Sequence, residues 1–453
     1  MQFLQTVGAF ILALGVLVTF HEYGHFWVAR KLGVKILRFS VGFGTPIWSR
    51  RFGADSTEFA VAAIPLGGYV KMLDEREGEV EEGERKRAFN RQTIAVRAAI
   101  VVAGPLANFL LAFIVYWLIY MTGVSGPRPI LGVVAPEGVA YSAGLREGDE
   151  IVAVNGRPTA IWDNVLNTAI EAILDASVLE LRVRRAEQLE RDLRLDFSGL
   201  SVDDLSRGDF FNKIGFELVR SKIPPKILQV VAGEAAAKAG LKAGDVILKA
   251  NGLVIDDWIR WVEQIRASPG QPLAVTVQRD GTVVQVALTP QSVNDDGRLI
   301  GRIGAEVFPP SQVTPPLMAT ERYSILAAAI RALDRTWELT HTTLKFLRQM
   351  IVGRASLDNL SGPLSIAQFA GESAKLGLSR FLEFIGLVSV SLAVLNLLPI
   401  PSLDGGHLVF YLIEFLARRP VPEAVQLYGQ QIGLVLLMSL MGLAIYNDLV
   451  RIF

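Results

Sequence analysis

Residues 3–29, FLQTVGAFILALGVLVTFHEYGHFWVA, combine an apolar run with a cluster of ionisable side chains. No charged residue precedes Glu22, and the apolar character continues beyond His25 to Ala29. The stretch reaches the roughly 20 residues that a membrane-spanning α-helix needs. A cleaved signal peptide would begin with a basic segment and end at a small-residue cleavage site, and neither feature is evident here. We therefore expect a first transmembrane helix over about residues 3–29.

Three more apolar segments indicate that the chain crosses the membrane four times. They cover about residues 98–121, 382–410 and 428–447. Within the third, Pro399 and Pro401 interrupt the helical pattern, as expected where irregular backbone lines a polar cavity. The sequence thus predicts an N-terminal membrane half over residues 1–123 and a C-terminal membrane half over residues 381–453.

The distribution of basic residues predicts the orientation in the membrane. Residues 1–20 carry no Lys or Arg, whereas residues 30–97 carry thirteen basic and nine acidic side chains. By the positive-inside rule, the 30–97 and 411–424 loops lie in the cytoplasm. Both termini and the segment from about 124 to 380 then lie on the outer side.

The composition excludes several classes of protein. Of 453 residues, 51% are hydrophobic, and 45 basic side chains balance 45 acidic ones. A mean hydropathy of +0.36 is too high for an ordinary soluble protein. A net charge of zero lacks the basic footprint of a nucleic-acid binder, so no nucleic-acid partner is expected. The absence of Cys excludes disulfides, thiolate metal sites and cysteine nucleophiles.

The pentapeptide His21-Glu22-Tyr23-Gly24-His25 has the pattern of a metal site. Residues four apart share one face of a helix, so both imidazoles can meet a single ion. Glu22 is then placed to accept a proton from a metal-bound water. The alternative is a pair of packed His side chains, but ionisable groups inside a span are costly and are normally functional.

A catalytic zinc site needs a third protein ligand and an open position. The segment Asn396-Leu-Leu-Pro-Ile-Pro-Ser-Leu-Asp-Gly-Gly-His407 offers both Asp404 and His407 at a matching depth in the membrane. Side-chain chemistry alone favours Asp404 only slightly, so at this point both residues stay open as the third ligand.

The outer segment contains an internal repeat. Residues 143–156, AGLREGDEIVAVNG, match residues 239–252, AGLKAGDVILKANG, at eight of fourteen positions. Each copy predicts a short helix ending at Gly, a Gly-Asp turn, a strand and an Asn-Gly hairpin turn. The pattern resembles the PDZ domain of bacterial proteases and predicts tandem domains over residues 124–221 and 222–309. Such domains bind extended peptide termini. The alternative, which the sequence favours equally, is that these copies only shape access to the membrane part or pack on it.

A connector over residues 310–380 is expected to be helical. Between residues 320 and 352, apolar side chains recur mostly at helical spacing among Arg, Lys, Asp and Glu. So many charges exclude a span and favour an amphipathic helix lying on the membrane or against the outer domains. His341 falls among the polar positions, and we expect it at the surface.

Together the two motifs resemble the site-two protease family of intramembrane zinc metalloproteases. H-E-x-x-H in a first span is followed in a later span by N-x-x-P-x-x-x-L-D-G, matched by Asn396, Pro399, Leu403, Asp404 and Gly405. The resemblance implies a Zn²⁺ ion on His21, His25 and Asp404, with Glu22 as the catalytic base. It also implies that Asn396 holds the substrate strand. His407 lies outside the matched motif.

Two further stretches support the resemblance. Gly104-Pro-Leu-Ala-Asn108 is similar to the family's G-P-x-x-N, although a small-residue site for helix packing explains the Gly equally well. Residues 39–44, FSVGFG, and 65–70, PLGGYV, resemble the family's membrane-associated β-sheet and Gly-rich loop. On this basis we expect Gly67, Gly68 and Pro399 to contact substrate.

The expected fold is a multi-pass α-helical membrane protein with four transmembrane helices, a small membrane-associated β-sheet and two tandem PDZ-like α+β domains. The resemblance implies an endopeptidase of the bacterial inner membrane, with periplasmic termini and PDZ domains and an active site towards the cytoplasm. Its partners would be membrane lipid and single-pass membrane proteins, such as a trimmed anti-sigma factor or remnant signal peptides. The PDZ pair would act as a size filter or bind peptide termini.

Two other classes of protein share some of these sequence features. A catalytically silent PDZ adaptor would have lost a ligand or the base, yet His21, Glu22, His25 and Asp404 are all present. A transporter would use intramembrane His, Glu and Asp side chains to line an ion pathway. The four predicted spans show no evident inverted repeat, which argues against a transporter.

Overall fold

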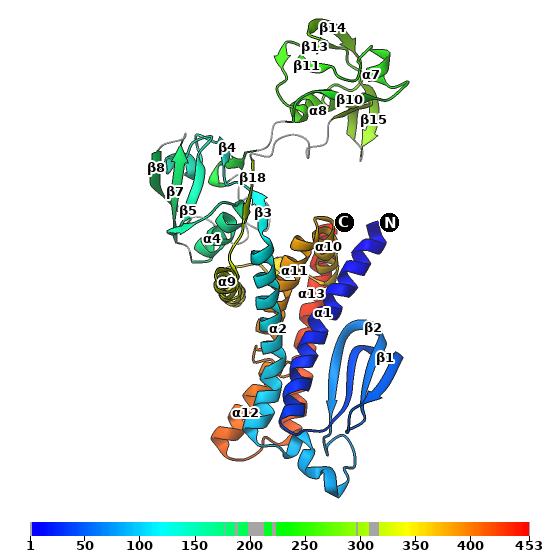
Figure 1. Cartoon of the computed structure of the whole chain (residues 1–453), viewed down its shortest axis with the longest axis vertical. Helices are drawn as coiled ribbons and strands as arrows, with labels where there is room; N and C mark the ends of the chain where they lie inside the picture. The colour runs from blue at the N-terminus through cyan, green and yellow to red at the C-terminus, as the bar shows by residue number, and fades with distance from the viewer. Residues whose placement is uncertain are drawn as a thin grey trace.

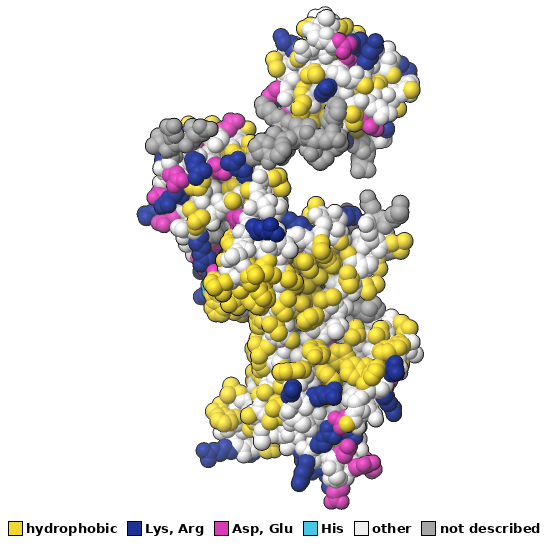
Figure 2. All heavy atoms as spheres, viewed as in Figure 1, with side chains coloured by type: hydrophobic (Ala, Val, Ile, Leu, Met, Phe, Trp, Pro, Cys, Tyr) yellow, Lys and Arg dark blue, Asp and Glu magenta, His cyan; other side chains and the backbone are white. Residues whose placement is uncertain are grey.

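The membrane part is a bundle of long apolar helices with both chain termini at the same end (Figure 1). The computed structural model describes residues 2–175, 177–185, 189–197, 213–219, 223–295, 298–307 and 317–452. Within these residues, four helices are long and apolar enough to cross a membrane: α1 (Gln2–Lys31), α2 (Ile94–Thr122), α11 (Leu378–Asn396) and α13 (Glu423–Ile452). Hydrophobic side chains form a belt around the bundle between two more charged ends (Figure 2). The chain is a multi-pass membrane protein, as the sequence predicted.

The segment predicted as a single span over residues 382–410 is two helices. Helix α11 ends at Asn396, and α12 (Asp404–Ala417) begins after a non-helical link. Pro399 and Pro401 have no N–H to donate and cannot continue a helix, so the chain breaks here. Helix α12 packs beside α2 and is not itself one of the four long apolar helices.

A twisted β-hairpin lies along α1 (Figure 1). It consists of β1 (Ile36–Phe52) and β2 (Thr57–Met72), and both strands bend at register shifts. As a result the first half of β1 lies between the two halves of β2, and Arg38 pairs with both Lys71 and Glu58. The second half of β1 forms an outer edge, where Trp48 pairs with Val61. The short helices η1 (Glu82–Arg87) and η2 (Phe89–Arg91) connect the hairpin to α2.

The outer segment carries two modules of the same construction, named here module 1 and module 2. Their four-stranded sheets have the orders β6-β5-β7-β8 and β12-β11-β13-β14. Module 1 contains β4 (Leu131–Val134), α3 (Val139–Ser142), β5 (Glu150–Val154), β6 (Arg157–Pro158), α4 (Trp162–Leu174), β7 (Val178–Arg185), β8 (Leu189–Asp196) and β9 (Phe216–Leu218). Module 2 contains β10 (Ile227–Val230), α7 (Ala235–Lys238), β11 (Val246–Ala250), β12 (Leu253–Val254), α8 (Trp258–Arg266), β13 (Leu273–Arg279), β14 (Thr282–Leu288), β15 (Gln291–Asp295), β16 (Arg298–Arg302) and β17 (Ala305–Val307).

The repeated residues perform the same local task in each module. The Asn-Gly pairs form tight turns, since Asn155 and Asn251 both have φ of 47°. Their side chains also accept a backbone N–H from the neighbouring strand. The Asp of each Gly-Asp turn, Asp149 or Asp245, is buried and pairs with an Arg at the end of the adjacent strand. The predicted hairpin-type turns are therefore present in both copies.

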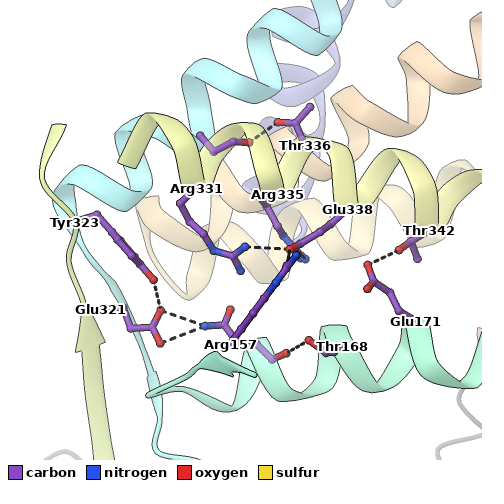
Figure 3. Close-up of polar contacts among 12 residues, drawn as sticks. Arg157, Thr168, Glu171, Glu321, Tyr323, Arg331, Arg335, Thr336, Glu338 and Thr342 are labelled. Atoms are coloured by element: carbon purple, nitrogen blue, oxygen red, sulfur yellow. Dashed lines mark hydrogen bonds and ion pairs between the residues drawn. The ribbon is translucent and has the colours of Figure 1, made fainter. Parts of the chain in front are cut away.

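A two-stranded stalk joins the modules to the membrane part. Strand β3 (Val124–Pro127) pairs with β18 (Met318–Glu321), and β3 directly follows α2. Residues 124–127, which the sequence analysis includes in the first PDZ-like domain, thus bring together the two ends of the outer segment. Glu321 in the stalk accepts hydrogen bonds from the side chains of Asn164 and Tyr323 (Figure 3).

The connector contains the expected amphipathic helix, α9 (Ile325–Ile351), which runs across the spans rather than along them (Figure 1). Its polar side faces module 1, where Glu338 pairs with Arg157 at 2.6 Å and Thr342 bonds Glu171 (Figure 3). Exposed apolar side chains such as Trp337 lie on α9 as well. His341 is exposed, as predicted.

The connector returns to the bundle through η6 (Leu357–Asn359) and α10 (Pro363–Lys375). Asp448 of α13 is fully buried and accepts the backbone N–H groups of Gly362, Leu364 and Ser365. These groups would otherwise lack partners at the start of α10, so Asp448 fixes that helix to the bundle.

Candidate metal centre

Helix α1 presents its two His side chains towards the interior of the bundle. His21 and His25 lie one turn apart, and their Nε2 atoms are 3.2 Å from each other. The two rings meet edge to face with centroids 4.9 Å apart. This is the arrangement expected of an i, i+4 pair that shares one ion.

Asp404 completes the cluster from a separate part of the chain. Its Oδ2 atom lies 3.3 Å from His21 Nε2 and 3.6 Å from His25 Nε2. Oδ2 is buried and has no well-formed hydrogen bond within the described residues. Among those residues, His21, His25 and Asp404 form the one group able to hold a metal ion, and His407 is not part of it.

The spacing of these atoms fits a tetrahedral Zn²⁺ site. Ligands at about 2.0–2.1 Å from zinc stand roughly 3.3 Å from one another in a tetrahedron. The distances between the three donor atoms run from 3.2 to 3.6 Å. Three protein ligands also leave a fourth position for water, as in catalytic rather than structural zinc sites. A single buried oxygen facing two ring nitrogens is thus well matched to zinc.

Two glycines explain how Asp404 reaches the cluster. A Cβ on Gly405 would lie 2.2 Å from the carbonyl oxygen of Leu398, and one on Gly406 would lie 2.3 Å from that of Ile400. Only glycine allows the link after α11 to fold so tightly against the start of α12. Asp404 is then the first residue of α12, where the helix dipole favours a carboxylate.

Helix α2 forms the back wall of the site. A Cβ on Gly104 would lie 2.3 Å from His25 Nε2, and one on Gly24 would lie 2.2 Å from the carbonyl oxygen of Ala103. Both glycines are required for α1 and α2 to approach closely. The carbonyl oxygen of Ile100 also lies 2.8 Å from His25 Nδ1. The G-P-x-x-N stretch therefore packs helices and lines the site at once.

Glu22 lies between the cluster and the β-hairpin. A Cβ on Gly68 would meet Glu22 Cγ at 3.2 Å and the carbonyl oxygen of Ser40 at 2.7 Å. Gly67 adopts φ of 130°, which side chains rarely tolerate, and it lies against Phe43. The structure thus brings the predicted Gly-rich loop beside the predicted base.

The other predicted substrate residues lie at the break after α11. Asn396 ends α11 with a half-buried side chain, and Pro399 is exposed in the link. Neither residue belongs to the metal-capable cluster. Their contact with substrate stays a prediction.

One polar neighbour of the cluster was not assigned a role from the sequence. Asn108 of α2 is fully buried, and its Nδ2 atom lies 3.2 Å from His21 Nδ1. The signal was present in the spacing, because Asn108 lies one helical turn after Gly104 and so on the same face of α2.

Comparison with known proteins places the chain in a family. Residues 9–440 match the description of peptidase family M50. The chain is 41% identical to the regulator of sigma-E protease RseP of Escherichia coli (strain K12), with 100% of each chain covered. It is 42% identical to a putative zinc metalloprotease of Neisseria meningitidis, covering 99% of this chain and 100% of that one. A PDZ domain of an SdrC-like protein from Listeria monocytogenes is 17% identical, with a TM-score of 0.17, covering 20% of this chain and 92% of that one.

The family match and the full-length relatives define the class of protein. The chain belongs to peptidase family M50, the site-two protease family, and is a zinc metalloprotease of that type. Among its relatives is also the regulator of sigma-E protease RseP of Salmonella typhimurium, 42% identical over 100% of each chain.

Proposed function

We propose that this chain is a zinc-dependent endopeptidase that hydrolyses a peptide bond within the transmembrane segment of single-pass membrane proteins. The observation that carries the proposal is the cluster of His21, His25 and Asp404, whose donor atoms lie 3.2–3.6 Å apart among membrane helices. A catalytic metal site among membrane helices is suited to a substrate that itself lies in the membrane.

The residues of the cluster divide the chemical work. His21, His25 and Asp404 would hold zinc, which supplies polarisation of a bound water and of the scissile carbonyl group. Glu22, on the next position of α1, accepts the proton from the water and returns it to the leaving amine. The half-buried setting of these side chains limits competing water and strengthens their electrostatic interactions.

A transmembrane helix must unwind before its peptide bond can be attacked. Its freed N–H and C=O groups then need partners, because lipid offers none. Among the strands that the structure describes, none pairs with the β-hairpin beside Glu22, so an unwound segment can add to its edge as a further strand. Gly67 and Gly68 let the hairpin pack closely against Phe43 and Glu22. We expect their backbone and the Asn396 amide to contact the added strand.

The setting in the cell follows from the relatives and from the charge distribution. We place the chain in the bacterial inner membrane, with modules 1 and 2 and both termini in the periplasm. The modules are tandem PDZ-like domains that filter substrates by size or bind their peptide termini. Substrates of this kind include a pre-trimmed anti-sigma factor, in accord with relatives named regulators of sigma-E protease, and remnant signal peptides.

The proposal is tested with Glu22→Gln, which keeps the shape of the side chain but removes the base. Wild type and variant are co-expressed with a single-span reporter, and zinc content is measured on the purified proteins. We expect Glu22→Gln to retain zinc and to lose cleavage by at least about 100-fold. Turnover retained by the variant would refute the assignment of Glu22.

Two further variants separate the ligands from their surroundings. Asp404→Asn is expected to lose zinc and cleavage together, because the amide is a poor zinc ligand. His407→Gln is the matched control, since His407 lies three residues on in the same helix but outside the cluster. Zinc loss in His407→Gln but not in Asp404→Asn would reverse the assignment of the third ligand.

A further inference from the structure

Asn108 is a buried amide with one atom towards the site and one without a partner. Its exposed fraction is 0%, and its Nδ2 atom lies 3.2 Å from His21 Nδ1. Its Oδ1 atom is buried and makes no hydrogen bond within the described residues. A buried amide oxygen without a donor destabilises the fold, so this side chain requires an explanation.

Metal binding by His21 determines which atom of the Asn108 amide must face the imidazole ring. When Nε2 of a neutral imidazole binds a metal ion, the proton of the ring lies on Nδ1, which becomes a donor. Nδ2 is also a donor, so the two cannot pair. Half a turn about the last side-chain bond exchanges Oδ1 and Nδ2 and puts an acceptor in the same place. In either orientation the amide atom that points away from His21 has no partner among the described residues. The orientation of the amide is therefore set by His21 alone.

The second His shows the same requirement already met. His25 Nδ1 lies 2.8 Å from the carbonyl oxygen of Ile100, an atom that can only accept. This contact keeps the proton of His25 on Nδ1 and leaves Nε2 free towards Asp404. His21 has no backbone carbonyl in the corresponding place among the described contacts, and Asn108 takes that position.

Asn108 is also firmly placed. The hydroxyl group of Ser389 on α11 donates to the backbone carbonyl oxygen of Asn108 at 2.8 Å, and both residues are fully buried. Gly104, one turn earlier, lets α2 lie directly against the His rings. The amide is therefore held at a set distance from His21 by two neighbouring helices.

We infer that Asn108 is a positioning residue for the metal site: with zinc bound, its Oδ1 accepts the Nδ1–H of His21 and so holds the tautomer and ring orientation that direct Nε2 to the ion. The inference rests on the proposed zinc site. It requires an acceptor at position 108, not merely a side chain of that size.

The test measures zinc affinity of the purified full-length protein by competition with a chromophoric chelator. Asn108→Leu preserves the volume and removes the acceptor, and we expect its zinc affinity to fall about 10–100-fold. Asn108→Asp accepts in either orientation and should stay within about threefold of wild type. Ser391→Ala is the matched control, since it removes a hydroxyl group of the same helix that bonds the Leu387 carbonyl oxygen of that helix; it should also stay within about threefold.

Each outcome decides the inference. Wild-type affinity in Asn108→Leu, or an equal loss in the Leu and Asp variants, would overturn it. If Asn108→Leu does not fold, Asn108→Ala adds no bulk and carries the same expected loss. His21→Ala reports on the site itself: if wild type and His21→Ala hold zinc equally, the proposed zinc site fails, whereas a loss in His21→Ala alone leaves the site standing and removes only the role of Asn108.

Discussion

Modules 1 and 2 share one fold but differ in how they are attached. Both have the same strand order, the same Asn-Gly turn and the same buried Asp paired with an Arg. Module 1 is bound to α9 and to α11, where Arg380 meets Asp163 at 2.6 Å. In module 2, the ion pairs Arg260–Asp256 and Arg279–Asp245 each join two residues of the module itself. Fold and attachment are thus separate properties of the repeat.

The sequence difference behind this contrast is small. Arg157 and Asp163 of module 1 hold the attachment, and the positions 96 residues later are Leu253 and Ile259. Leu253 is the first residue of β12 and Ile259 the second residue of α8, so the matching strand and helix are present in module 2. Module 2 therefore carries apolar side chains at the two positions through which module 1 is attached.

The largest effect is expected where the modules are alike. Asp149→Ala and Asp245→Ala each remove a carboxylate that is at most 1% exposed and that binds an Arg and a turn N–H. We expect each variant to lose about 2–4 kcal/mol of its own module's stability, reduced from a fully buried pair because the Arg side chains are partly exposed. Hydrogen exchange on the full-length protein reads each module separately. Asp192→Ala, in an exposed pair, is the control and should leave the hydrogen exchange of module 1 unchanged. Unequal losses from Asp149→Ala and Asp245→Ala would show that the two modules are not equivalent.

A smaller effect is expected where the modules differ. Glu338→Ala removes the partner of Arg157 at 2.6 Å and of Arg331 at 3.0 Å. We expect attachment of module 1 to weaken by about 1–3 kcal/mol, seen as faster hydrogen exchange in α4. Helix α8 should be unchanged. Arg260→Ala, which breaks a pair within module 2, is the control, and an equal response of α4 to both variants would contradict the assigned attachment.

The turns should respond equally and more weakly. Asn155→Ala and Asn251→Ala lose a side-chain hydrogen bond to a strand and force alanine to adopt φ of 47°. A cost of about 1–2 kcal/mol is expected in each module. Asn155→Gly and Asn251→Gly remove the backbone strain but not the lost bond, so they should recover part of the loss. Thermal unfolding of the full chain, resolved by module through hydrogen exchange, measures all four variants.

The pH dependence of module 2 is the mildest test. Burial alone would raise the pKa of Asp245, but its bonds to Arg279 and to the Lys242 N–H hold that pKa below the ordinary value of 3.8. The pair therefore contributes stability above pH 3.8 and loses it as pH falls through the folded-state pKa. Pulse proteolysis with pepsin from about pH 4.5 to about pH 2 should show growing cleavage of module 2. Asp245→Asn should show a flatter dependence over that range, and an identical slope in both proteins would refute the cause.

The sequence predicted the parts of this molecule that depend on local pattern. Apolar runs located the spans, and the i, i+4 spacing put His21 and His25 on one face. Residue chemistry alone did not choose between Asp404 and His407; that choice depends on how Gly405 and Gly406 fold the link after α11. The contact of Asn108 with His21 joins residues 87 apart, and only the crossing of α1 and α2 creates it. The attachment of module 1 was hidden for the same reason, since Arg157 and Glu338 are 181 residues apart.

The close crossing at Gly24 and Gly104 has a consequence for motion in the site. A Cβ on Gly24 would lie 2.2 Å from the carbonyl oxygen of Ala103, so the backbones of α1 and α2 are in close contact at this crossing. We therefore expect His21 and His25 to keep their positions relative to α2. Asp404 begins the short helix α12, which follows the non-helical link after α11, and the hairpin is joined to α1 by a turn. We therefore expect any widening that admits a substrate strand to come from α12 and the hairpin, while the geometry of the imidazole pair is kept.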